Sequence, residues 1–107
     1  MSLRVILTEP AEHEFLAASQ WWARHRSLDQ ATRWYEGFQD ALETLRNNPE
    51  RCALARENPK FPFELRELHY GLGSRPTHRA LFTIRPDMVL VLTIRHAAQQ
   101  DVTPDEL

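Results

Sequence analysis

The chain has 107 residues, of which 42% are hydrophobic and 26% charged, and its formal net charge at pH 7 is −2. These values are typical of one soluble globular domain and exclude a disordered or fibrous protein, while the longest apolar run, residues 88–92, is too short to cross a membrane. We therefore expect a single domain over residues 1–107, located in the cytoplasm, where the lone cysteine, Cys52, would stay reduced.

The first half of the chain predicts a strand followed by a helix. Residues 3–7 are rich in Leu, Val and Ile, as strands are, and Thr8 is suited to cap a helix that begins just after it. Pro10 is tolerated in the first turn of such a helix. Apolar side chains then recur at helical steps, at Ala11, Phe15, Ala18 and Trp22.

A second helix is predicted to follow almost at once. Ser27 and Gln30 have the spacing of a capping box, which marks the start of a helix. Apolar side chains continue at helical steps as far as the stop signal Asn47-Asn48-Pro49, at Ala31, Tyr35, Phe38, Leu42 and Leu45. Because the connection between the two helices is short, we predict an antiparallel helical hairpin.

The second half of the chain predicts strands. Residues 51–62 lack a regular period and form a loop, whereas residues 63–69, 78–84 and 88–96 have the composition of strands, the first of them with a bulge. The fold class is therefore α+β: an N-terminal strand, a helical hairpin, and about three antiparallel strands, all strands forming one twisted sheet with the hairpin on one face.

The hydrophobic pattern of the last two strands predicts their register. A three-residue turn at Arg85–Asp87 places Arg79 opposite Arg95 and Thr83 opposite Val91. The side facing the helices would then carry the apolar residues Ala80, Phe82, Ile84, Leu90, Leu92 and Ile94. Two opposed arginines repel each other unless an anion lies over them, so Arg79 and Arg95 are candidates for a face that binds a target or a phosphate.

The tryptophans and histidines suggest different roles. Trp22 belongs to the apolar stripe of its helix, whereas Trp21 and Trp34 fall beside the stripes and are candidate anchors for a protein partner. The five histidines lack the spacing of metal ligands, and the chain has no glycine-rich phosphate loop. We therefore predict no metal and no cofactor.

Several segments, taken together and in this order, resemble the RelE/ParE superfamily of bacterial toxins, and more closely its ParE, plasmid-stabilisation branch. They are Glu9-Pro10-Ala11-Glu12 after the first strand, residues 42–49 at the end of the hairpin, Leu65-Arg66-Glu67-Leu68, and the strands at 78–84 and 89–96. The resemblance covers most of the chain. It implies a growth-inhibiting toxin held inactive by an antitoxin that is encoded beside it.

Within this superfamily the resemblance implies two different actions. ParE-type toxins are associated with poisoning DNA gyrase, whereas RelE-type toxins cut messenger RNA on the ribosome. The RelE route needs clustered cations and a group that moves protons. The positions that match its catalytic motif are Arg66, Arg79 and His96.

The chain departs from the RelE pattern in ways that favour the ParE-like interpretation. Glu64 occupies a position that is basic in the RelE pattern, and residues 97–100 after His96 contain no basic side chain. The sequence pI of about 6.2 is low for a protein that binds ribosomal RNA. We expect a ParE-like inhibitor of gyrase first, a RelE-like endoribonuclease second, and thirdly a degenerate module that binds antitoxin without being toxic.

Overall fold

The computed structural model describes residues 2–107 and has the predicted order of elements. In chain order these are β1 (Arg4–Leu7), α1 (Glu9–His25), α2 (Leu28–Glu43), β2 (Arg66–Tyr70), β3 (His78–Ile84) and β4 (Met88–His96). The α+β fold class is thus confirmed, and the bounds of the last two strands are those that the sequence predicted. Within the described part of the chain, neither helix has the length and apolar content needed to cross a bilayer.

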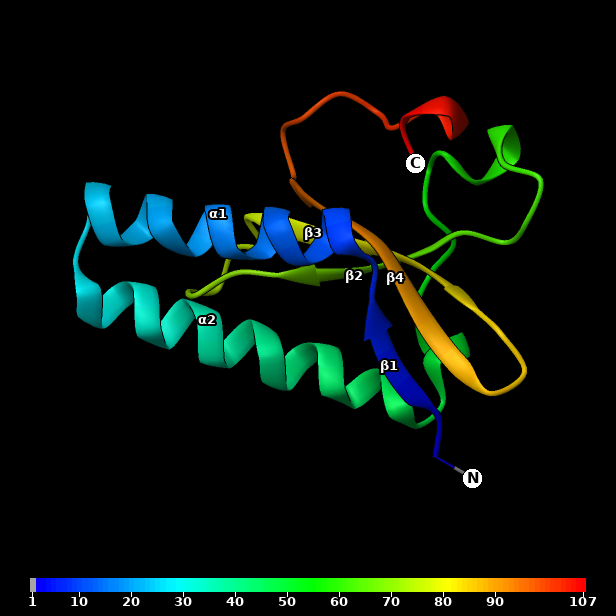
Figure 1. Cartoon of the computed structure of the whole chain (residues 1–107), viewed down its shortest axis with the longest axis horizontal. Helices are drawn as coiled ribbons and strands as arrows, with labels where there is room; N and C mark the ends of the chain where they lie inside the picture. The colour runs from blue at the N-terminus through cyan, green and yellow to red at the C-terminus, as the bar shows by residue number, and fades with distance from the viewer. Residues whose placement is uncertain (1) are drawn as a thin grey trace.

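The helix starts are set by the predicted capping residues. The Thr8 hydroxyl accepts a hydrogen bond from the Ala11 N–H at 3.2 Å, and the Ser27 hydroxyl accepts one from the Gln30 N–H at 3.0 Å. Each bond satisfies an amide that the first helical turn would otherwise leave unpaired. Figure 1 shows the result, two antiparallel helices joined by a very short connection.

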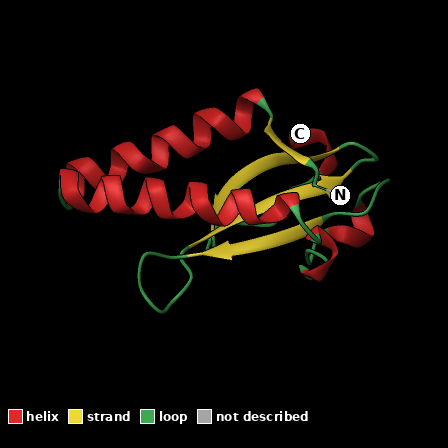
Figure 2. Cartoon of the chain, turned by 90° about the horizontal axis from the view of Figure 1, so that it is seen from below, coloured by secondary structure: helices red, strands yellow, loops and turns green. Residues whose placement is uncertain are grey.

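The four strands form one sheet in the order β1-β4-β3-β2, in which β1 runs parallel to β4 and the other neighbours are antiparallel. Both helices lie along one face of the sheet (Figure 2). They bury the main core against that face, with Phe15, Trp34, Phe38, Phe82, Val89 and Val91 among its members.

The register of β3 and β4 is as predicted only in the half of the hairpin that lies away from the turn. Arg79 pairs with Arg95, but the register shifts between Leu81 and Phe82, so that Thr83 pairs with Leu90 and not with Val91. Leu92 is the extra residue of this bulge, since Leu81 pairs with Thr93 and Phe82 with Val91. The bulge places Val89 and Val91 in the helix-side core, so the prediction that Leu90 and Leu92 would occupy it was wrong.

The second face of the sheet is also covered. A smaller core there buries Leu65, Leu81 and Val102, which come from the segment before β2, from β3 and from the C-terminal segment. Figure 1 shows the C-terminal segment lying beside the loop that leads from α2 to β2. The expectation that this face would expose its arginines was therefore wrong, because the loop and the C-terminus pack over it.

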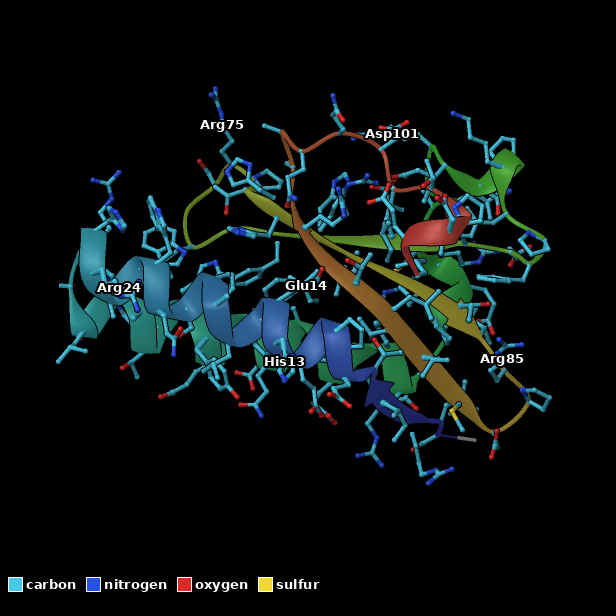
Figure 3. All side chains as sticks on the ribbon, turned by 45° about the horizontal axis from the view of Figure 1, so that its top comes forward. His13, Glu14, Arg24, Arg75, Arg85 and Asp101 are labelled. Atoms are coloured by element: carbon cyan, nitrogen blue, oxygen red, sulfur yellow. The ribbon has the colours of Figure 1, made fainter. Side chains whose placement is uncertain are left out.

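A third contact joins α1 to the edge of β4. Beyond the end of β1 that edge has no neighbouring strand, and side chains from the start of α1 bind it instead. The Thr8 hydroxyl donates to the Leu92 carbonyl, and Glu14 accepts from the Ile94 N–H at 3.0 Å and the Thr93 hydroxyl at 2.8 Å. Figure 3 shows Glu14 directed toward β4 while its neighbour His13 points away. These bonds protect an otherwise open strand edge.

Candidate functional site

Arg79, the residue shared by both predicted site roles, lies inside the protein. Arg79 and Glu57 are each only 1% exposed. The two terminal nitrogens of Arg79 donate to the two carboxylate oxygens of Glu57, and one of them also donates to Glu67 at 3.3 Å. Glu57 in turn accepts from the Val102 N–H at 3.1 Å. The anion that we expected over Arg79 is thus supplied by the protein itself.

The charges of this buried pair are mutually stabilised. Burial on its own would raise the pKa of Glu57, but the Arg79 hydrogen bonds and charge, together with the Val102 N–H, lower it below its ordinary value. Burial would likewise lower the pKa of Arg79, but Glu57 and Glu67 raise it. Both side chains are therefore ionised at neutral pH. Removing Arg79 leaves the Glu57 carboxylate buried without a charged partner, whereas removing Glu57 leaves Arg79 with Glu67 alone.

Arg66 is also engaged within the fold. It donates to the backbone carbonyls of Cys52 at 2.6 Å and Glu50 at 3.1 Å, and it forms an ion pair with Glu64 at 2.8 Å. These contacts fasten the loop after α2 to the start of β2. Glu64, which stands where the RelE pattern has a cation, instead neutralises the nearest arginine.

The remaining candidates lie at the end of β4. Arg95 pairs with Arg79 across the sheet, is half-buried, and donates to the Gln100 carbonyl at 3.0 Å. His96 is exposed, and its Nδ1 accepts from the Ala98 N–H at 3.1 Å. His96 is the only one of the three catalytic candidates with a solvent-exposed side chain. The structure therefore does not bring Arg66, Arg79 and His96 together as a free cationic cluster.

His78 and His96 are opposed on β3 and β4, with ring centroids 5.2 Å apart. His78 also packs edge-on against Trp34 at 5.0 Å. Burial, and to a lesser degree the charge of His96, lowers the pKa of His78 to about 4. His78 is therefore neutral at pH 7.

The two candidate partner anchors differ in exposure. Trp34 is completely buried among Phe15, Phe38 and Tyr70, so the expectation that it lies at the margin of the core was wrong. Trp21 is 46% exposed and is available to a partner. Ala31 and Phe38 are at helical spacing from both Trp34 and Tyr35, which is why the sequence pattern did not single out Trp34 as the core residue.

The structure gives little support to metal or thiol chemistry. In the chain from residue 2 onward, no three His, Cys, Asp or Glu side chains gather in a way that could hold a metal ion. Cys52 is buried, and burial raises the pKa of its thiol, although Arg51 and Arg66 oppose the shift. A thiol in such surroundings is a poor nucleophile.

A family model and one solved structure agree with this architecture. The family described as "ParE toxin of type II toxin-antitoxin system, parDE" matches residues 5–101. A chain of the chromosomal ParDE system from P. aeruginosa superposes with a TM-score of 0.70 at 15% identity, over 89% of this chain and 96% of that one. The archaeal RelE-RelB complex from Pyrococcus horikoshii OT3 gives a TM-score of 0.42 at 16% identity, over 94% of this chain and 100% of that one.

No curated protein sequence matches the chain. The family match spans nine-tenths of the residues, and the P. aeruginosa structure shows the same fold. The chain therefore belongs to the ParE toxin family of type II toxin-antitoxin systems, within the RelE/ParE superfamily.

Proposed function

We propose that this protein is a cytoplasmic toxin that stops growth by binding DNA gyrase, and that an antitoxin encoded beside it neutralises it. Membership of the ParE family supports the toxin role. The observation that carries the choice of a protein target over RNA is the buried pair of Arg79 and Glu57. A guanidinium held by two carboxylates has its charge neutralised and its terminal nitrogens occupied.

The ribonuclease alternative has unfavourable geometry in this chain. In-line attack of a 2′-hydroxyl on phosphate needs free cations beside the developing negative charge and a group that moves protons. Arg79 faces Glu57 and Glu67, and Arg66 is bound to Glu64 and to backbone carbonyls. His96 meets the requirement for an exposed proton-transfer group, so ribonuclease activity is the second candidate and an explicit outcome of the test.

Induced expression of the chain in bacteria separates the candidates. We expect growth arrest with DNA breaks and with full-length transcripts, and rescue when the product of the adjacent gene is expressed as well. Cuts in messenger RNA at codon positions, mapped by primer extension, would favour the ribonuclease. Normal growth with a folded, abundant chain would favour the non-toxic, antitoxin-binding module.

A variant without the guanidinium sharpens this experiment. The double substitution Arg79→Met with Glu57→Gln removes both buried charges together and keeps an oxygen that accepts from Val102. Replacing a buried ion pair by groups of similar volume is often close to neutral for stability. We expect the folded double variant to arrest growth, whereas a ribonuclease that uses Arg79 would lose its activity.

A further inference from the structure

The helical hairpin carries opposite charge at its two ends. Residues 15–35, which include the connection between α1 and α2, contain Arg24, Arg26 and Arg33 but only one acid, Asp29. The opposite end of the hairpin carries the carboxylates of Glu9, Glu12, Asp40 and Glu43. The formal net charge of −2 is therefore an average over two ends of different sign.

The loop before β3 adds a further arginine to the basic end. Arg26, which follows α1, and Thr77 line the same pocket, so the loop that ends at Thr77 lies beside the end of α1. This loop contributes Arg75, and residues 68–78 contain no Asp or Glu. We call the surface formed by Arg24, Arg26 and Arg75 the basic tip. Figure 3 shows Arg24 and Arg75 in the same half of the molecule.

The three guanidinium groups of the basic tip are exposed and have no charged partner. None of them forms an ion pair with a carboxylate of residues 2–107, whereas Arg33 is paired with Asp29 at 3.2 Å. Arg26 makes a cation–π contact with Trp21 at 5.9 Å, which leaves its N–H groups free to donate in the guanidinium plane. In contrast to Arg79, these side chains present positive charge that the fold does not neutralise.

The acidic end of the hairpin lies too far away to cancel this charge. Glu9 and Arg24 are fifteen residues apart in α1, which corresponds to about 22 Å along the helix axis. The Debye length at physiological ionic strength is about 8 Å. An anion that approaches the basic tip is therefore attracted by the arginines and is little affected by the distant carboxylates.

We propose that the basic tip binds the phosphate backbone of duplex DNA. A guanidinium can donate two parallel hydrogen bonds to one phosphate, and a duplex presents phosphates in regular succession. The three arginines come from a helix end and a neighbouring loop, and this spread over a surface suits several phosphates better than one small anion. The choice of DNA as the polyanion rests on the proposed function, because gyrase acts on DNA; the unpaired charge of the basic tip does not.

Fluorescence anisotropy with a labelled duplex of about 20 base pairs and arbitrary sequence tests the contact on the whole chain without gyrase. Three phosphate contacts predict that the logarithm of the binding constant falls with the logarithm of the salt concentration with a slope of about −2.7, or about fortyfold between 50 and 200 mM. A polyglutamate peptide of equal total charge should compete far less well than unlabelled duplex, because its linear charge density is lower. Binding that does not depend on salt, or equal competition by the peptide, would overturn the proposal.

Two triple variants of equal net charge locate the contact. The first replaces the three arginines of the basic tip by glutamine, and it should bind the duplex at least tenfold more weakly and with a flatter salt dependence. The matched control removes the same charge from exposed positions in the other half of the molecule, where Figure 3 shows Arg85. It carries Arg4→Gln, Arg46→Gln and Arg85→Gln.

The control variant should bind DNA as the unchanged chain does. The ion pairs that it loses are exposed and contribute little to stability. Circular dichroism checks that both variants are folded. Equal weakening in the two variants would show that net charge alone matters, and it would overturn the basic tip as the site.

Crosslinking in a complex with gyrase and plasmid tests where the DNA lies. Ser74→Cys, next to Arg75, carries a photoactivated crosslinker and should capture DNA, whereas the same label on Asp87→Cys should capture little. Cys52 is buried, so the label reacts with the introduced thiol. Equal capture from both positions, or none from Ser74→Cys when gyrase is bound, would overturn the DNA contact. Salt-dependent DNA binding by a chain that does not inhibit gyrase would overturn only the proposed function, so the two failures are distinguishable.

Discussion

Arg79 and Glu57 form a buried ion pair between β3 and the loop that precedes β2, at positions 22 residues apart in the chain. Replacing Arg79 with Ala leaves the Glu57 carboxylate buried with the Val102 N–H as its main remaining donor. We expect this substitution to lower the free energy of unfolding by about 3–5 kcal/mol, measured by urea denaturation at pH 7.

The double substitution Arg79→Met with Glu57→Gln is the control for that prediction. It should recover most of the lost stability, because no unpaired charge remains in the interior. If the double variant is as unstable as Arg79→Ala alone, the buried pair must stabilise the folded state by more than the mutual neutralisation of its two charges.

Gly37, in the middle of α2, should resist substitution. In an exposed helix interior, Gly→Ala stabilises by about 1 kcal/mol, but here an added Cβ would lie 2.0 Å from the Tyr70 hydroxyl oxygen. The Tyr70 ring is stacked on Phe38 with centroids 4.7 Å apart, which restricts its retreat. We expect Gly37→Ala to lower the free energy of unfolding by about 1–3 kcal/mol.

The companion change is Tyr70→Phe. Removing the hydroxyl relieves the closest contact. Gly37→Ala should therefore lower the free energy of unfolding clearly less in the Tyr70→Phe background than in the unchanged chain. Additive effects of the two substitutions in denaturation experiments would show that the hydroxyl is not the obstacle.

His78 should make stability fall as the pH is lowered from 7 to 5. Its pKa is about 4 in the folded protein against an ordinary value of 6.5, so the unfolded chain takes up the proton first. The stability lost below pH 6.5 levels off near pH 4, where the folded state is protonated too. Between pH 7 and 5 this linkage amounts to about 2 kcal/mol.

Urea denaturation at pH 7 and pH 5 measures this difference in the free energy of unfolding. The variant His78→Phe keeps an aromatic ring against Trp34 and should remove most of the difference. Both measurements lie above the ordinary pKa of Glu57, so the buried carboxylate contributes little to the difference. An undiminished slope in the variant would assign the effect to other histidines.

The C-terminal segment should act as part of the fold. Val102 is fully buried in the second core and donates its N–H to Glu57. We expect Val102→Ala to lower the free energy of unfolding by about 2 kcal/mol, and deletion of residues 101–107 to lower it further. Deletion of residues 103–107 alone is the matched control, and it should have a much smaller effect in thermal denaturation because that part is mostly exposed.

Local signals in the sequence were sufficient for most of the fold. Thr8 and Ser27 cap the helices as their side chains predict, because a cap depends only on neighbours in the chain. The turn at residues 85–87 likewise sets the bounds of β3 and β4. The bulge at Leu92 was not predictable from alternation, since residues 89–92 are all apolar and both faces of the sheet are buried.

The candidate site was harder to predict because its partners are distant in sequence. Glu57 lies in a loop whose sequence has no regular hydrophobic pattern, and no neighbouring residue indicates a contact with Arg79 or Val102. Trp34 and Tyr35 fit the helical spacing equally well, and only packing decides between them. Trp21 lies beside the apolar stripe of its helix, as expected, and is 46% exposed.

Whether the chain acts on gyrase or on RNA is tested most directly by incubating the purified protein with gyrase, ATP and relaxed plasmid, and in parallel with translating ribosomes. We expect loss of supercoiling with cleaved plasmid, and messenger RNA that stays full-length, for both the unchanged chain and the folded Arg79→Met, Glu57→Gln variant. Codon-positioned cuts in the messenger RNA, abolished in that variant while supercoiling is unaffected, would show that the chain acts on RNA and not on gyrase.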